Sequence, residues 1–279
     1  MEEYYFLFFL GLVWTIFAVV QDMKNREVAN WLTFSLIGFA LAYRGFYSSF
    51  SGNWMFFVYG LLGFGFFYVL AHAFYYTKVF AGGDAKLLMG YGVLLPYSNY
   101  FSVLVLGIGF VFILFLIGAF WSMSYGVKIV SGDWGKFKRE FIVNLNKYGL
   151  YILGLVVFVG IFSMVWLGGL SGWSFGVFVL GLLWVYIKSL DKCMIRSVNV
   201  GKLREGDWLE KDVKVGGRVI RKSVHGLSLS DIKLLKKVGK KVLIKGGVPF
   251  TPAFLIALLV VMVFFYLTSG LVLFSFLRF

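Results

Sequence analysis

The chain has 279 residues, of which 60% are hydrophobic, 21% aromatic and only 14% charged. Ordinary soluble domains carry about 25% charged residues, so this balance excludes that class and predicts a polytopic membrane protein. The single cysteine excludes an intrachain disulfide and a zinc site built on cysteines, and two histidines are too few for a metal site of their own. We therefore expect no metal and no cofactor.

Eight apolar runs follow one another along the chain. Most come close to the ~20 residues that a helix needs to cross a bilayer, which predicts about eight transmembrane helices. The fourth run is short and contains Pro96, which is typical of a tilted or broken helix, and without it the count is seven. The first run is expected to stay as a permanent helix, because Glu2 and Glu3 precede it in place of the basic residues of a signal peptide. The runs cover residues 4–21, 30–47, 54–77, 86–98, 100–122, 148–168, 172–189 and 251–275.

Lysine and arginine indicate the orientation of these helices. Placing Lys24 and Arg26, after the first run, in the cytoplasm puts nearly every basic residue on the inner side, and only Arg44 and Arg278 fall elsewhere. Both termini are then outside a multi-pass protein of the plasma membrane. The net charge of +14 is explained by this orientation and by contact with anionic membrane lipids, so we expect no nucleic-acid partner.

Residues 190–250 differ in composition and predict a small α+β cytoplasmic domain before the last helix. The stretch DVKVGGRVI predicts a hairpin, and KVLIK predicts another strand. The stretch SLSDIKLLKKVGK predicts a helix that Ser228 or Ser230 caps and Gly239 ends. The expected fold is thus an all-α polytopic bundle with this one small addition. Its parts are a transmembrane bundle over 1–189, the cytoplasmic domain over 190–250 and a final transmembrane helix over 251–279.

Two acidic residues directly border apolar runs. Asp22 ends the first run in VVQDMKNREVANWLTF, and Asp84 opens the fourth in AGGDAKLLMG. Charge at membrane depth costs several kcal/mol, so such residues tend to be functional. Both lie at the cytoplasmic boundary in this topology and can meet at one depth. Two close carboxyl groups are the acid and the base of an aspartic protease: one, ionised, takes a proton from water, and the other, protonated, polarises the scissile carbonyl.

The helix ends predict how this pair shares its proton. Asp84 begins a helix, where the positive end of the dipole favours a carboxylate, whereas Asp22 ends one; we therefore expect Asp84 to be ionised at rest. Gly82 and Gly83 predict a tight turn with room for a substrate backbone, and Lys86 could pair with Asp84 or with a lipid phosphate. The structural alternative for each aspartate is an ordinary helix cap or a solvated boundary residue.

The same residues resemble a known family. QDMKNREVANWLT, followed about 50 residues later by GGDAKLLMG, is similar to the type IV prepilin peptidases, especially the archaeal preflagellin peptidase branch of these GxGD membrane aspartic proteases. Asp22 matches the aspartate after their first span, Asn30 the asparagine that follows it, and Asp84 the aspartate of G-x-G-D. Ala81 stands at the first glycine of that motif and Ala29 at a proline, so the loops would turn differently. Residues 203–260 also resemble the cytoplasmic segment and last span of the archaeal branch.

The resemblance implies an endopeptidase that removes the short basic leader of preflagellins and type IV prepilins at the cytoplasmic face, without a cofactor. Asp22 and Asp84 are then its catalytic residues. The chain lacks the cysteine-rich insert of many bacterial members, so their second activity, N-methylation, is not implied. A few acidic residues interrupt the basic inner face, and we expect some of them to meet the basic leader: Glu27, Glu205, Asp207, Glu210 and Asp212.

Other classes stay open. A presenilin-like or signal-peptide-peptidase-like protease also pairs an aspartate with G-x-G-D, but in late consecutive spans and with a P-A-L motif, which Pro252-Ala253-Phe254 matches only loosely. A proton- or cation-coupled transporter would use the aspartates as an ion site and the short fourth run as a discontinuous helix, although the chain has no internal repeat. A non-catalytic scaffold displaying residues 190–250 would leave Asp→Asn substitutions silent.

Overall fold

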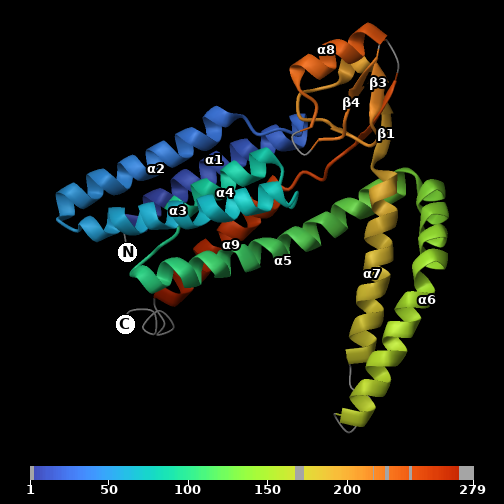
Figure 1. Ribbon diagram of the computed structural model, residues 1–279. Coiled ribbons are helices and arrows are strands. Elements are labelled where there is room, and N and C mark those ends of the chain that lie inside the picture. The colour runs from blue at the N-terminus through green and yellow to red at the C-terminus, as the bar shows by residue number, and fades with distance from the viewer. Residues whose placement is uncertain (1–2, 167–172, 216, 224–225, 239–240, 270–279) are drawn as a thin grey trace. The chain divides into compact units, whose positions relative to one another are not determined.

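The computed structural model of the chain describes residues 3–166, 173–215, 217–223, 226–238 and 241–269, which form nine α-helices and five short strands (Figure 1). They divide into two compact units, one made of Met1–Met123 with Val248–Phe279 and the other of Ser124–Gly247. The first unit is a bundle of helices drawn from both ends of the chain. It contains both predicted aspartates.

The first unit is built around α4, which packs against α1, α2 and α3, while α1 also packs against α9. Figure 1 shows α4 among these helices. The helices of this unit are α1 (Glu3–Asn25), α2 (Asn30–Ser51), α3 (Trp54–Tyr76), α4 (Gly82–Leu94), the part of α5 (Tyr100–Gly132) up to Met123, and α9 (Thr251–Ser269).

Five of the described helices are long and apolar enough to cross a membrane: α1, α3, α5, α6 (Trp134–Trp166) and α7 (Trp173–Cys193). The chain is thus mostly helical with several candidate spans, as expected of a multi-pass membrane protein. The predicted eight spans are not confirmed. The remaining three apolar runs correspond to α2, which carries Arg44, to α4 with 13 residues, and to the shorter apolar stretch Thr251–Leu267 of α9.

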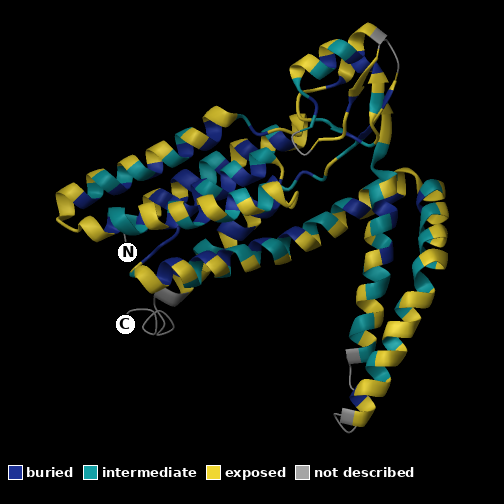
Figure 2. Cartoon of the chain, in the orientation of Figure 1, coloured by how far each residue is buried: buried dark blue, intermediate teal, exposed yellow. Residues whose placement is uncertain are grey.

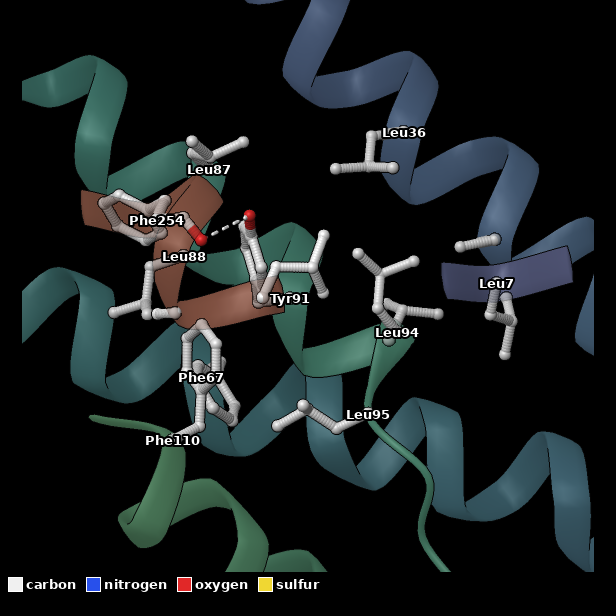
Figure 3. Close-up of a cluster of buried hydrophobic side chains, with 14 of the residues drawn as sticks. Leu7, Leu36, Phe67, Leu87, Leu88, Tyr91, Leu94, Leu95, Phe110 and Phe254 are labelled. Carbon is white, nitrogen blue, oxygen red and sulfur yellow. Dashed lines mark hydrogen bonds between the residues drawn. The ribbon is translucent and has the colours of Figure 1, made fainter. Parts of the chain in front are cut away.

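The short helix α4 is the most deeply buried element of the bundle. At 1.5 Å per residue its 13 residues reach about 20 Å, less than the ~30 Å thickness of a hydrocarbon core. Figure 2 shows α4 largely in the colour of buried residues, and Leu88, Tyr91 and Leu94 are 0% exposed. Figure 3 shows these side chains packed against residues from neighbouring helices, among them Phe67. α4 ends two residues before Pro96, in agreement with the short fourth run.

A buried arginine closes the C-terminal end of α4. Arg44 of α2 is 0% exposed, and it donates hydrogen bonds to the carbonyl oxygens of Val93 (2.8 Å), Leu95 (2.7 Å) and Phe56 (2.7 Å). The last carbonyls of a helix have no partner within it, and in an apolar interior they must find one elsewhere. Gly60 lies against Arg44 and leaves the guanidinium its space. Arg44 therefore lets α4 end inside the bundle.

The second unit contains the small α+β region that the composition predicted. β1 (Ile195–Val198), β5 (Val242–Lys245) and β2 (Trp208–Leu209) form an antiparallel sheet in that order. β3 (Val213–Val215) and β4 (Arg218–Ile220) pair as the expected hairpin, and a 3-10 turn covers Val200–Lys202. The placement of this region in the cytoplasm and the predicted boundaries at 190 and 250 stay predictions.

The expected helix of this region is α8 (Leu229–Val238), and Ser228 caps it. The Ser228 hydroxyl accepts a hydrogen bond from the Asp231 backbone N–H (3.2 Å), while the Asp231 carboxylate accepts one from the Ser228 N–H (3.1 Å). This reciprocal arrangement is a capping box. Ile232 and Leu235 are buried in the core of the region, whereas Gly239 lies outside the described residues.

Candidate active site

Asp22 lies in the last turn of α1 and is only 8% exposed. Its carboxylate oxygen Oδ2 accepts two hydrogen bonds from Thr251, one from the hydroxyl (2.9 Å) and one from the backbone N–H (3.3 Å). Thr251 is the first residue of α9, whose leading N–H groups have no partner within the helix. Asp22 therefore caps a helix that lies 229 residues further along the chain.

Asp84 is the third residue of α4 and is 9% exposed. Its carboxylate accepts a hydrogen bond from the backbone N–H of Ala81, the residue before the helix. The carboxyl groups of Asp22 and Asp84 are close enough for the charge of one to act on the other. Because burial and a like charge both oppose ionisation, two such groups do not ionise together easily, and the pair can share a proton.

A hydrogen bond deeper in the bundle sets the level at which the aspartates meet. The hydroxyls of Thr15 on α1 and Tyr91 on α4 lie 2.7 Å apart, and Tyr91 also donates to the carbonyl oxygen of Phe254 on α9 (3.2 Å, dashed in Figure 3). Asp22 follows Thr15 by seven residues, and Asp84 precedes Tyr91 by seven. Seven residues are about two helical turns. With α1 and α4 antiparallel, the Thr15–Tyr91 contact places the two aspartates opposite each other.

The glycines before Asp84 act differently from what the sequence suggested. Gly82 and Gly83 are the first residues of α4, and the turn before them is made at Lys78, which has a φ of 64°. A Cβ at Gly83 would lie 3.2 Å from the Cβ of Val28. Val28 belongs to the loop that follows Asp22 and fills the space beside Gly83. A glycine at position 83 therefore leaves room for this loop.

Lys86 and Asn30 lie together, although 56 residues separate them. The Lys86 Nζ donates a hydrogen bond to the Asn30 side-chain oxygen at 2.6 Å, so Lys86 pairs with α2 where the sequence suggested Asp84 or a lipid. Glu27 is exposed in the same loop between α1 and α2. Glu27 thus lies in the α1–α2 loop, Asn30 at the start of α2, and Lys86 two residues after Asp84 on α4.

The other acidic residues expected to meet a leader belong to the second unit. Asp207 accepts a hydrogen bond from the Arg204 backbone N–H (2.8 Å), and Asp212 accepts one from the Lys222 backbone N–H (2.8 Å). Glu210 forms an ion pair with Lys222 at 3.7 Å. Three of the four thus have partners within their own region, and their role as leader contacts stays a prediction, as does that of Glu205.

Sequence analysis missed Thr251, Thr15 and Tyr91. A threonine followed by proline at the start of an apolar run is a recognisable helix start, and Thr251-Pro252 is one. Thr15 and Tyr91 are polar interruptions on the helix faces of Asp22 and Asp84, two turns away. Such spacing could have indicated a shared face, but a partner on α9 cannot be inferred from periodicity.

Together these features define a class of site. An apolar helical bundle buries two interacting carboxyl groups at helix ends and hydrogen-bonds both of them. This is the minimum apparatus with which an aspartic protease of the membrane would hold an acid beside a base. Among the residues that the structure describes, no group of three or more histidine, cysteine or acidic side chains gathers into a metal site.

Comparison with known proteins agrees with this class. Residues 9–123, which include both aspartates, match the family model described as the Type IV leader peptidase family. Two curated relatives are named preflagellin peptidase. That of Methanocaldococcus jannaschii is 32% identical over 92 residues, or 33% of this chain and 39% of that protein. That of Methanococcus voltae is 33% identical over 90 residues, or 31% and 37%.

Residues 9–123 are thus similar to the type IV leader peptidase family, and the two relatives named above are archaeal preflagellin peptidases, so the predicted resemblance is confirmed. The chain spans about two fifths of the length of these relatives in the matched regions. The family match does not reach residues 203–260, whose likeness to the archaeal branch stays a prediction. No solved structure matches the chain.

Proposed function

We propose that the protein is an integral-membrane aspartic endopeptidase that removes the basic leader of preflagellins or related type IV prepilins. The observation that carries the proposal is the buried, interacting pair of Asp22 and Asp84 within the residues that match the leader peptidase family. In the part of the chain that the structure describes, the partners of the two carboxyl groups are Thr251, the Ala81 N–H and each other, so no basic side chain accounts for their burial as an ordinary ion pair. An interacting pair of buried acids is costly for stability alone and suits acid–base chemistry.

The reaction follows from the two carboxyl groups. The ionised aspartate takes a proton from a water molecule whose oxygen attacks the scissile carbonyl carbon, while the protonated aspartate gives its proton to the carbonyl oxygen. When the tetrahedral intermediate collapses, the C–N bond breaks, and the amine leaves with the proton first taken from water. The oxygen-bound proton returns to the second carboxyl group, so the pair ends in its starting state. No other reagent is consumed.

The substrate class follows from the position of the pair at the helix ends. Asp22 is in the last turn of a candidate span and Asp84 in the first turn of α4, so a peptide bond just outside a substrate's own apolar helix could reach them. In the proposed topology this level is the cytoplasmic face of the plasma membrane, with both termini outside. The basic segments would contact anionic lipids, and exposed Glu27 would contact the basic leader.

The direct test is cleavage in detergent of a substrate that carries a basic leader before an apolar helix. Wild-type protein should shorten the substrate, and Asp22→Asn and Asp84→Asn should each lower kcat by at least about a hundredfold. Asp133→Asn is the matched control, because Asp133 also lies at a helix start but is exposed. It should retain wild-type cleavage.

The same preparations separate the alternatives. Proton or cation flux in liposomes without cleavage would favour a transporter. If both asparagine variants behave like the wild-type protein, the scaffold is favoured. A cut within the substrate's apolar helix, instead of before it, would favour the intramembrane proteases. A wild-type protein that leaves leader-bearing substrates intact contradicts the proposal.

A further inference from the structure

The start of α9 brings a residue to the aspartate pair that no motif singled out. Thr251 is 0% exposed, and both of its donors, the hydroxyl and the backbone N–H, are directed at a single atom, Oδ2 of Asp22. It lies outside residues 9–123, the part of the chain that matches the leader peptidase family. The contact therefore joins the C-terminal helix to the pair.

We infer that Thr251 is a positioning residue of the pair: it holds the Asp22 carboxylate in one orientation and stabilises its ionised form. Asp22 is then the base that activates water, and Asp84 is the acid that protonates the carbonyl oxygen. This inference rests on the proposed peptidase function. It reverses the assignment expected from the sequence, which makes Asp84 the ionised partner.

The hydrogen bonds decide which of the two aspartates is ionised. Donors favour the ionised form of a carboxyl group, and bonds to a charged acceptor are about twice as strong as neutral ones. Asp22 accepts two bonds from Thr251, whereas Asp84 accepts a backbone bond from Ala81. Asp22 also lies at the N-terminal end of α9, where the positive end of the helix dipole favours a carboxylate. This offsets the negative dipole end of α1, which disfavours one. The sequence-based assignment considered α1 alone.

The charged groups around Asp22 do not change which of the two aspartates is ionised. From α4, Asp84 is the titratable group that acts on it, and Lys86 on the same helix is hydrogen-bonded to α2. From α2, Arg44 binds the opposite end of α4. On α1 itself, Lys24 is exposed. The described residues of α9 include no acidic, basic or histidine side chain.

The test compares Thr251→Val and Thr251→Ser in the full-length protein in detergent, with kcat and KM for a leader-bearing substrate measured across pH. Valine removes the hydroxyl at nearly constant size. The ionised base is then less stabilised, so the acidic limb of kcat should move to higher pH by roughly one unit. The maximal kcat should fall about tenfold with KM within about twofold, because the bond supports the base and not substrate binding. Serine keeps the donor and should keep the wild-type profile.

Two further variants keep the test decisive. Ser48→Ala removes a buried hydroxyl of the same bundle that has no hydrogen-bond partner, and it should leave the profile unchanged. If Thr251→Val does not fold, Thr251→Cys replaces it, since a thiol has the size of the serine side chain but is a weak donor. Cysteine should shift the acidic limb where serine does not.

Three results would overturn the inference while wild-type protein still cleaves. They are an unmoved acidic limb in the valine and cysteine variants, a serine variant that shifts as much as valine, and a change in KM alone. A shift of the basic limb in place of the acidic one would also overturn it, because Asp22 would then be the acid. A wild-type protein that cleaves no leader-bearing substrate removes the proposed function, and this inference with it.

Discussion

Replacing Arg44 by methionine tests whether the short helix α4 is held by its C-terminal end. Methionine keeps much of the length and volume of the arginine stem but has no donor. Arg44 donates to the carbonyls of Val93 and Leu95, which lie at the end of α4, and to that of Phe56 in the first turn of α3. Without Arg44 the Val93 carbonyl loses its partner, whereas the Leu95 carbonyl still accepts a hydrogen bond from the Tyr97 N–H at 3.1 Å.

The expected cost follows from these bonds. A buried acceptor that loses its partner costs about 1–3 kcal/mol, and the Val93 carbonyl is such an acceptor. The stacking of the guanidinium on Phe56, 4.5 Å from the ring centroid, adds roughly 1 kcal/mol. Against this, a buried charge no longer has to be desolvated. We expect a net loss of about 2–3 kcal/mol in the free energy of unfolding.

The assay is reversible unfolding in mixed detergent, with Arg139→Met as the matched control. Arg139 is 71% exposed and its ion pair with Glu140 is long, at 3.9 Å, so its loss should cost less than about 1 kcal/mol. Arg44→Lys should lie between, because one ammonium group cannot reach all three carbonyls. Arg44→Met with a stability within about 0.5 kcal/mol of wild type would refute the reasoning, since the α4 carbonyls would then be satisfied without Arg44.

The remaining predictions concern the register and spacing of α1 and α4. Thr15→Val and Tyr91→Phe should each destabilise the bundle by about 1–2 kcal/mol, and the double variant should lose less than their sum by about 1 kcal/mol, as an unfolding double-mutant cycle would measure. Additive losses would mean that the 2.7 Å contact carries no energy. Gly83→Ala should lower both stability, by about 1–3 kcal/mol, and cleavage, because its Cβ meets Val28. Adding Val28→Gly, which removes the contacting Cβ, should restore much of the lost cleavage, and failure of that rescue would place the strain elsewhere.

The sequence was informative where a signal is local. A few neighbouring residues were enough to predict the hairpin of β3 and β4, the capped helix α8 and the short α4 before Pro96. The two aspartates stood out because charge beside an apolar run is costly. Their family likeness followed from the same short motifs.

Long-range partners could not be read in this way. Asp22 is capped by Thr251, Lys86 is bound by Asn30, and Arg44 closes α4. Each contact joins helices that are distant in the sequence. The hydrophobic periodicity of a helix does not reveal which other helices lie next to it. The predicted count of eight spans stays unconfirmed for a related reason, because hydropathy cannot tell a helix buried by its neighbours from one buried by lipid.

The most direct measurement of the central claim is kcat for Asp22→Asn, Asp84→Asn and the double variant on one leader-bearing substrate. If the buried pair acts as a unit, either single change should remove nearly as much activity as the double change. Near-normal cleavage by either single variant, or losses that simply add, would contradict the account.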